Sequence, residues 1–171
     1  MKTLVIVAYP DLTSSRVNSA LAKGAKSVAN VEVCSLYELY PDGKIDVATE
    51  QAVLSQTDHI VLQFPMYWYS TPALLKQWQD DVLTYGWAYG SKGKALVGKT
   101  LSVAVSLGAS ENDYQPNSEM GHTVDEFLLP IKTMARYTNM QYSKTFVVGG
   151  ALKISDEQIA QAVSRYQAFL A

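Results

Sequence analysis

Short apolar runs alternate with longer amphipathic segments along this chain. Residues 2–8 form a nearly continuous, β-branched apolar run, which predicts a strand buried on both faces. Comparable runs predict further strands after it, each separated from the next by polar positions. These further strands are expected at residues 31–36, 59–64, 100–107 and 145–148.

The segments between the strands show helical periodicity. Thr71 and Pro72 predict the N-cap and first position of one helix. The capping-box pattern from Ser155 to Gln158 predicts the start of a terminal helix, and Pro-Asp-Gly at residues 41–43 predicts a turn. The helices are expected at residues 15–28, 47–55, 71–84, 123–137 and 155–170.

Strands alternate with helices five times, which predicts a doubly wound α/β domain with a parallel sheet. No repeat or linker interrupts the pattern, so residues 1–171 are expected to form a single domain. Five strands suit the flavodoxin-like order 2-1-3-4-5. Ligands of such sheets bind beyond the carboxyl ends of the strands. The loops at residues 9–18, 65–71 and 108–122 are therefore the candidate site.

Composition narrows the class of protein. The net charge of −2 gives no electrostatic reason to expect nucleic-acid binding. No apolar run is long enough to cross a bilayer, and the short N-terminal run is better explained as a strand than as a secretion signal. The single cysteine, Cys34, fits a reducing compartment. We therefore expect a cytoplasmic protein, and we expect no metal site.

The first candidate loop carries hydroxyl groups where a helix begins. Thr13, Ser14 and Ser15 precede Arg16, a cation in a first turn that ordinarily favours carboxylates. An anionic ligand would explain the cation, because guanidinium pairs well with phosphate. The alternative is that Ser14 or Ser15 only caps the helix and Arg16 points to water.

The second candidate loop is rich in aromatic residues. Tyr67, Trp68 and Tyr69 follow Met66 directly after a buried strand. Such side chains can wall a flat ring system while backbone N–H groups bond its polar edge. The alternative is that they form only the rim of the core.

The third candidate loop is long and polar. Gly108 allows the backbone to approach a ligand closely. Tyr114 and His122 are able to donate or relay protons. The alternative is that both are bystanders.

Together these segments resemble the NAD(P)H:quinone oxidoreductase family. The nearest branch holds the flavoprotein ancillary subunits of glutathione-gated potassium efflux systems and related bacterial quinone reductases. The resemblance is carried by S-x-x-N at residues 15–18, by QFPMYWYSTPALLKQWQDDVL at residues 63–83 and by the Gly108 loop with Tyr114. It continues through residues 122–131 and 139–150.

The resemblance implies a flavin-binding homodimer of flavodoxin-like fold. It implies FMN as cofactor, with FAD as the alternative, since the chain has no long C-terminal extension like that of the larger animal enzymes. Tyr114 and His122 match catalytic positions. The matching cofactor-binding positions are Tyr9, Ser15, Arg16, Val17, Asn18, Pro65, Met66, Tyr67, Trp68, Tyr69, Ser106, Leu107, Gly108 and Ala109.

Three positions depart from the family pattern. Tyr9 stands where the family usually has a histidine, although its phenol still donates a hydrogen bond. Ser-Leu-Gly-Ala at residues 106–109 replaces a Thr-Thr-Gly-Gly-like loop. His122 lies eight residues beyond Tyr114, farther than in the better-studied branch. These departures bear on affinity and rate more than on fold.

The activity that the resemblance implies is a two-step ping-pong reaction. NAD(P)H reduces the flavin, and a quinone or similar acceptor then takes the two electrons. One alternative is a regulatory subunit with little turnover that partners a membrane potassium antiporter. Another is a flavodoxin-type one-electron carrier, which the modest net charge disfavours.

Residues 85–89 form an aromatic stretch with three alternative roles. It walls the acceptor pocket, or it contacts a second subunit, or it only packs on the core.

Overall fold

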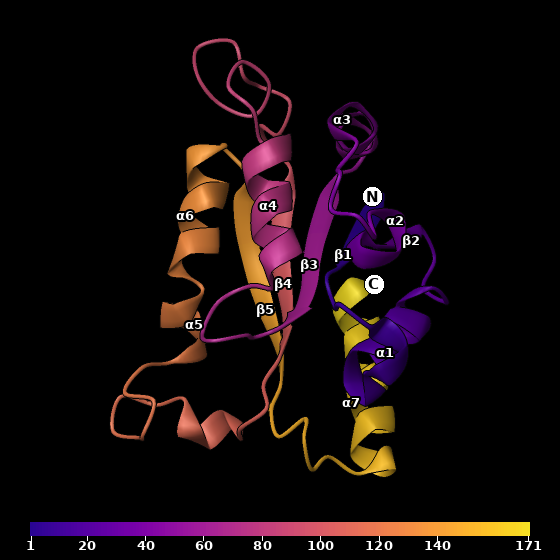
Figure 1. Ribbon diagram of the computed structural model, residues 1–171, viewed down its shortest axis with the longest axis vertical. Coiled ribbons are helices and arrows are strands. Elements are labelled where there is room, and N and C mark those ends of the chain that lie inside the picture. Colours follow the sequence, from indigo (N-terminus) through magenta and orange to yellow (C-terminus); the bar gives the residue numbers. More distant parts are fainter.

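A five-stranded parallel sheet in the order β2-β1-β3-β4-β5 forms the centre of the protein in the computed structural model, which describes residues 1–171 (Figure 1). This order confirms the flavodoxin-like fold expected from the sequence. All strands run in the same direction, so their carboxyl ends gather at one edge, the lower one in Figure 1. The strands are β1 (Thr3–Val7), β2 (Val31–Ser35), β3 (His59–Pro65), β4 (Thr100–Ser106) and β5 (Gln141–Val148).

Helices cover both faces of the sheet (Figure 1). None of them is long and apolar enough to cross a membrane. Two short 3₁₀ turns, Leu12–Ser14 and Glu111–Asp113, lie in the loops that follow β1 and β4. The helices are α1 (Arg16–Ala25), α2 (Leu36–Leu39), α3 (Val47–Ser55), α4 (Ala73–Val82), α5 (Val124–Phe127), α6 (Leu129–Tyr137) and α7 (Asp156–Leu170).

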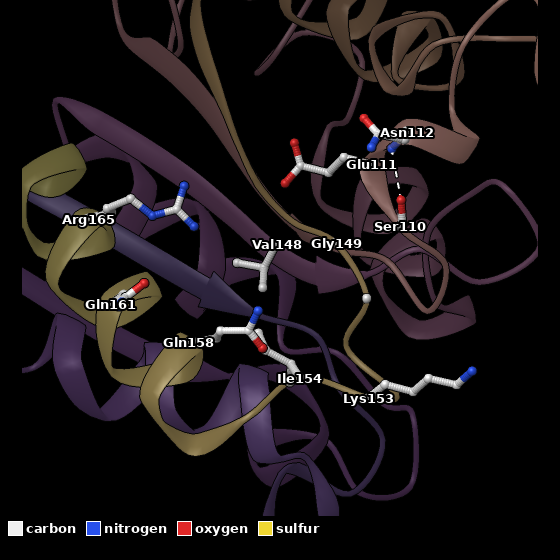
Figure 2. Close-up of a pocket in the computed structure, with 11 residues that line it drawn as sticks. Ser110, Glu111, Asn112, Val148, Gly149, Lys153, Ile154, Gln158, Gln161 and Arg165 are labelled. Atoms are coloured by element: carbon white, nitrogen blue, oxygen red, sulfur yellow. Dashed lines mark hydrogen bonds between the residues drawn. The ribbon is translucent and has the colours of Figure 1, made fainter.

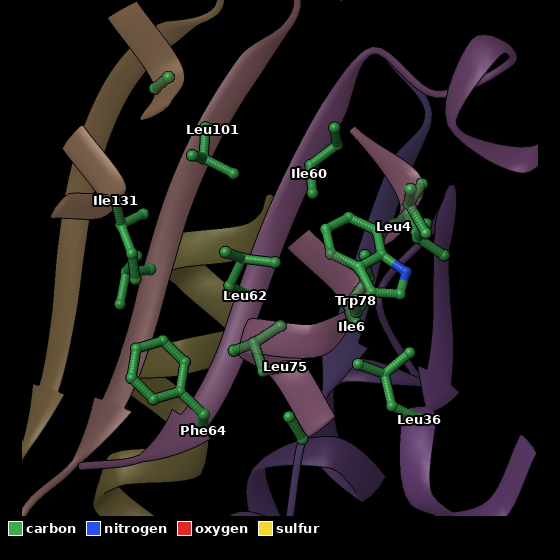
Figure 3. Close-up of a cluster of buried hydrophobic side chains, with 14 of the residues drawn as sticks. Leu4, Ile6, Leu36, Ile60, Leu62, Phe64, Leu75, Trp78, Leu101 and Ile131 are labelled. Carbon is green, nitrogen blue, oxygen red and sulfur yellow. The ribbon is translucent and has the colours of Figure 1, made fainter. Parts of the chain in front are cut away.

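Side-chain alternation along the strands builds two hydrophobic cores. On β1, Val5 and Val7 face the helices α1 and α7, while Leu4 and Ile6 face the other side. The second face packs against α4, whose Leu75 and Trp78 share one cluster with Ile6 of β1 (Figure 3). Because both faces are covered, the central strands β1, β3 and β4 are largely apolar along their length rather than alternating.

Two helices start or break where the sequence did not predict. Helix α4 begins at Ala73, with Pro72 at the cap position and no side-chain cap, so the prediction of a Thr71 cap is wrong. Instead the Leu74 N–H donates to the Tyr37 hydroxyl at 3.3 Å, a tertiary contact that local sequence cannot reveal. The helix expected at residues 123–137 is two helices, since Pro130 lacks an N–H and disfavours continuous helix.

The fifth strand is longer than expected. It begins at Gln141 rather than at residue 145, and its first half is largely exposed. An edge strand lacks a second neighbour, so polar residues such as Ser143 and Lys144 are tolerated there. Apolar periodicity therefore revealed only its buried end.

Candidate functional site

The start of helix α1 presents unbonded backbone donors. Ser15 caps the helix, and its Oγ accepts from the Asn18 N–H at 3.0 Å. The N–H groups of Arg16 and Val17 lie in the first turn of the helix, where no earlier helical carbonyl can accept from them. They therefore remain free for a ligand. The capping interpretation of Ser15 is thus confirmed, and it coexists with a helix terminus suited to an anion.

Arg16 is tied to helix α7. Its Nη1 donates to the Ile154 carbonyl at 2.8 Å, and its Nη2 pairs with Asp156 Oδ1 at 2.6 Å. Both charged side chains are more than half exposed, so this ion pair contributes little to stability. Arg16 is also the only charged residue that lines the cavity described below.

The aromatic segment after β3 forms a tight turn with unusual backbone angles. Trp68 and Tyr69 have φ values of 45° and 61°, which large side chains rarely adopt. Tyr67 and Ser70 close the turn with reciprocal backbone hydrogen bonds at 3.0 and 2.9 Å. The N–H groups of Trp68 and Tyr69 have no partner within the protein. Strained turns with free donors are a feature of ligand sites.

The aromatic rings of this turn point in different directions. Tyr67 packs edge-on against Tyr9, with ring centroids 6.3 Å apart. Burial raises the pKa of Tyr67 to about 12, and the neighbouring Tyr9 adds to the shift, so this phenol stays protonated at neutral pH. Tyr69 stacks on Phe127 at 4.9 Å. Trp68 is 92% exposed and touches neither core.

The loop after β4 also offers free backbone donors. The N–H groups of Gly108 and Ala109 have no partner within the protein. The Ser106 carbonyl accepts from the Met66 N–H at 2.9 Å, which holds this loop beside the aromatic turn. Leu107 differs from its neighbours, because its side chain is fully buried in the core.

A cavity of about 320 Å³ lies where these loops meet. Ten of the fourteen predicted cofactor-binding residues line it; Trp68, Tyr69, Leu107 and Ala109 do not. The lining also includes Ser14 and two residues that the sequence reasoning missed, Ala151 and Leu152. These two follow β5, and the rule that all parallel strands end at one edge is the signal that points to them. The predicted lining residues are Tyr9, Ser15, Arg16, Val17, Asn18, Pro65, Met66, Tyr67, Ser106 and Gly108.

Tyr114 and His122 lie outside this cavity. Tyr114 is buried, and its ring packs edge-on against Phe127 at 5.9 Å. Burial, with smaller contributions from Tyr69 and Asp113, raises the pKa of Tyr114 and keeps its phenol protonated. His122 is exposed, and its Nδ1 lies 3.7 Å from Glu126. The rings of both residues pack edge-on against Phe127, which lies 5.7 Å from His122 and stacks on Tyr69 of the aromatic turn.

A second and larger cavity, of about 530 Å³, lies between α7 and the Glu111–Asp113 turn (Figure 2). Arg165, Lys153 and Glu111 line it, together with amide side chains such as Gln158. Figure 2 shows Glu111 and Arg165 extending into the space between the two elements. This lining is polar and carries both signs of charge, and it has no aromatic wall. The smaller cavity is therefore the better site for a planar ligand.

Comparison with known proteins places the chain among flavodoxin-like proteins. The family model Flavodoxin_2, described as a flavodoxin-like fold, matches residues 1–170. The uncharacterized NAD(P)H oxidoreductase YrkL of Bacillus subtilis is 46% identical over 170 residues, covering 99% of this chain and 98% of the relative. The glutathione-regulated potassium-efflux system ancillary protein KefF of Klebsiella aerogenes is 40% identical over 96% of this chain and 92% of its own.

Two solved structures are closely similar to this fold. The general stress protein 14 of Treponema denticola in complex with FMN has a TM-score of 0.95 and 42% identity, covering 99% of this chain and 98% of its own. An NADPH-quinone reductase from P. pentosaceus has a TM-score of 0.91 and 34% identity, covering 100% and 98%.

Proposed function

The chain belongs to the Flavodoxin_2 family of flavodoxin-like proteins, and from that premise we propose that it is an FMN-dependent NAD(P)H oxidoreductase that reduces quinones or similar acceptors. The observation that carries this proposal is the 320 Å³ cavity, where the free backbone donors of Arg16, Val17 and Gly108 meet the aromatic side chains of Tyr9 and Tyr67. The names of the similar proteins support the same activity.

The start of α1 suits the FMN phosphate. Free N–H groups at Arg16 and Val17 point out of the helix terminus, and its dipole favours negative charge. The Arg16 guanidinium adds a cation at the cavity wall. Asn18 is 1% exposed and lines the same cavity, and its Oδ1 has no partner within the protein. A buried acceptor needs a donor, and the ribityl hydroxyls of FMN are donors.

The two other loops suit the flavin ring. Tyr67 and Met66 provide apolar surface for its face. The free N–H groups of Trp68, Tyr69, Gly108 and Ala109 are donors for the oxygens and nitrogens of its polar edge. FAD, the alternative cofactor, shares this flavin moiety, so the same residues would hold it. We favour FMN because the relative with a bound flavin contains FMN.

FMN, when bound, would supply the redox chemistry, a two-electron transfer from NAD(P)H to the acceptor. The chain's residues would hold the ring and place backbone donors at its edge. Tyr114 remains a protonated phenol behind Phe127, and we assign it a positioning role through the Tyr69 stack. His122 is solvent-exposed and we route no step through it.

The proposal is tested by visible absorption of the purified protein supplied with FMN. Anaerobic NADH or NADPH is expected to bleach the flavin band, and benzoquinone is expected to restore it. Asn18→Asp is the loss-of-binding variant, since it places a carboxylate in the cavity that must also accept the phosphate, and it loses the donor to Ser106. Ser102→Ala is the control, because Ser102 lies near the start of β4, away from the cavity. It should take up flavin as the wild type does. A folded wild-type protein that takes up no flavin would overturn the proposal.

A second candidate function follows from the similarity to KefF. In this hypothesis the flavoprotein regulates a membrane potassium antiporter and turns over little. Full FMN occupancy with negligible quinone reduction, together with antiporter co-purification, would favour it over the enzyme.

Three finer features complete the proposal. A single domain over residues 1–171 fits the continuous sheet, and a cytoplasmic location fits the use of NAD(P)H. A homodimer is inferred from the family resemblance. The aromatic cluster of Tyr85, Tyr89 and Tyr137, at the end of the molecule remote from the cavity, is exposed enough to serve as its contact. Sedimentation of the holoprotein measures that oligomeric state.

A further inference from the structure

A glutamine lies in the most deeply buried strand of the sheet. Gln63 is fully buried on β3, between Leu62 and Phe64, which are also fully buried. Its strand neighbours are Val7 and Ala104, so it is a polar residue in an apolar layer. Its Nε2 donates to the Asn18 carbonyl at 2.9 Å, which joins β3 to the first turn of α1.

Asn18 extends this contact to the loop after β4. Its Nδ2 donates to Ser106 Oγ at 2.8 Å, and its own N–H donates to Ser15 Oγ. The Ser106 carbonyl in turn accepts from the Met66 N–H. Gln63, Asn18 and Ser106 thus form a buried network that links the loops following β1, β3 and β4. These are the loops that line the 320 Å³ cavity.

Stability alone does not explain this network. Burying a carboxamide costs about 1–3 kcal/mol unless both ends are bonded, and the Gln63 Oε1 has no partner within the protein. An apolar side chain of the same shape is often neutral or stabilising at such a position. The Asn18 carbonyl would still accept a bond within helix α1. What an apolar side chain at position 63 could not do is donate to the Asn18 carbonyl and so hold Asn18 against β3.

We propose that Gln63 is a positioning residue for the cofactor site, acting through Asn18 and Ser106 to fix the phosphate-binding start of α1 against the ring-binding loops. This inference rests on the proposed function, because it needs FMN as the ligand. It adds a residue that does not line the cavity to those that determine cofactor affinity.

The test compares Gln63→Met with Ser102→Ala. Methionine keeps the length and removes the donor. Ser102→Ala breaks the buried His59–Ser102 hydrogen bond of 2.9 Å between β3 and β4, near the ends of these strands that lie opposite Gln63. FMN and riboflavin dissociation constants are measured by flavin fluorescence, and the unfolding midpoint of each apoprotein is measured alongside. We expect Gln63→Met to weaken FMN about tenfold, which corresponds to one buried hydrogen bond. Riboflavin lacks the phosphate but keeps the ribityl hydroxyls that meet Asn18, so it should lose less affinity than FMN does.

Gln63→Glu provides the second variant. Burial favours the protonated carboxylic acid, which donates to the Asn18 carbonyl as the amide does. We expect FMN affinity near that of the wild type at low pH and a loss of affinity as the pH rises and the carboxyl ionises. The low-pH comparison is the informative one, because an ionised carboxylate at this buried position would weaken FMN whatever the role of Gln63. If Gln63 only fills space, Gln63→Met should bind FMN as tightly as Gln63→Glu does at low pH.

Three outcomes decide the matter. Selective loss of FMN affinity in Gln63→Met, with the apoprotein as stable as Ser102→Ala, supports the inference. FMN affinity equal to that of Ser102→Ala, or an equal loss for FMN and riboflavin, overturns it while the proposed function stands. A wild-type protein that binds no FMN overturns both. Should Gln63→Met fail to fold, Gln63→Leu, which also lacks the donor, takes its place with the same three outcomes.

Discussion

At the scale of single residues, the site combines free backbone N–H donors with residues in strained backbone conformations. Trp68 and Tyr69 adopt left-handed backbone angles, which cost about 1 kcal/mol or more for large side chains. The same angles occur at Asn30 and Asn139, where asparagine tolerates them. Aromatic residues in such a turn, with exposed N–H groups, indicate that ligand binding rather than stability set their identity.

Arg16 gives the first prediction at this scale. Its partner Asp156 is almost fully exposed, so exchanging that carboxylate for a phosphate costs little. We expect Arg16→Ala to raise the FMN dissociation constant about tenfold, through loss of a charge-assisted contact. Asp156→Ala should tighten binding, because it frees the guanidinium. Equilibrium titration with FMN measures both.

The opposite behaviour of Asp156→Ala separates two roles of Arg16. If Arg16 only fastens α1 to α7, both variants weaken FMN alike, and the direct phosphate contact is then ruled out. The sequence pointed to Arg16 from its unfavourable place in a first turn. It gave no sign of Ile154 or Asp156, which lie about 140 positions away along the chain.

At the scale of elements, local signals predicted most of the fold. The buried strands and the capping box at Ser155 follow from periodicity and spacing, and the structure has them at nearly the predicted positions. The errors have tertiary causes. Tyr37 from α2 supplies the hydroxyl at the start of α4, and the exposed first half of β5 has no apolar pattern to detect.

His59, at the amino end of β3, gives a prediction of pH dependence. It is buried beside Ser102, and burial, with a smaller effect of Lys144, lowers its pKa. Below about pH 6.5 the unfolded chain binds a proton that the native imidazole resists. The contribution of neutral His59 to the free energy of unfolding is therefore fully present above that pH and is lost as the pH falls. We expect the wild type to lose up to about 1 kcal/mol from this source by about pH 5.

Urea unfolding at several pH values measures the effect. His59→Gln should flatten the acid side of the profile relative to the wild type. His122→Gln is the matched control, because the chain has only two histidines and His122 is exposed. Equal slopes for the wild type and both variants would mean that His59 does not contribute to acid sensitivity.

At the scale of the whole molecule, parallel topology brings distant segments to one edge. The loops after β1, β3, β4 and β5 begin about 40 to 60 residues apart in sequence, yet all four line one cavity. Topology alone therefore predicted the first three loops as the site. It did not choose between the two cavities flanking the Gly149–Gly150 loop, because that choice depends on side-chain chemistry. Nor could spacing reveal that Gln63, inside β3, is hydrogen-bonded to Asn18 at the start of α1.

Hydrogen–deuterium exchange with and without FMN tests this arrangement. A ligand that binds only the native state slows local opening where it binds, and at about 100 times the dissociation constant it adds about 2.7 kcal/mol of stability. We expect the largest protection at residues 14–18, 66–70 and 106–109. The segment at residues 84–99 lies at the opposite end of the sheet and should gain only the global increment (Figure 1).

The second cavity makes this experiment decisive. Its lining includes Asn112, Gln161 and Arg165, none of which touches the smaller cavity. If FMN protects residues 110–113 and 158–165 while Trp68 and Tyr69 exchange as before, the flavin lies in the larger cavity. The free donors of the aromatic turn would then need another explanation. Protection of Trp68 and Tyr69 places the ring against that turn, because their N–H groups have no partner other than a ligand or water.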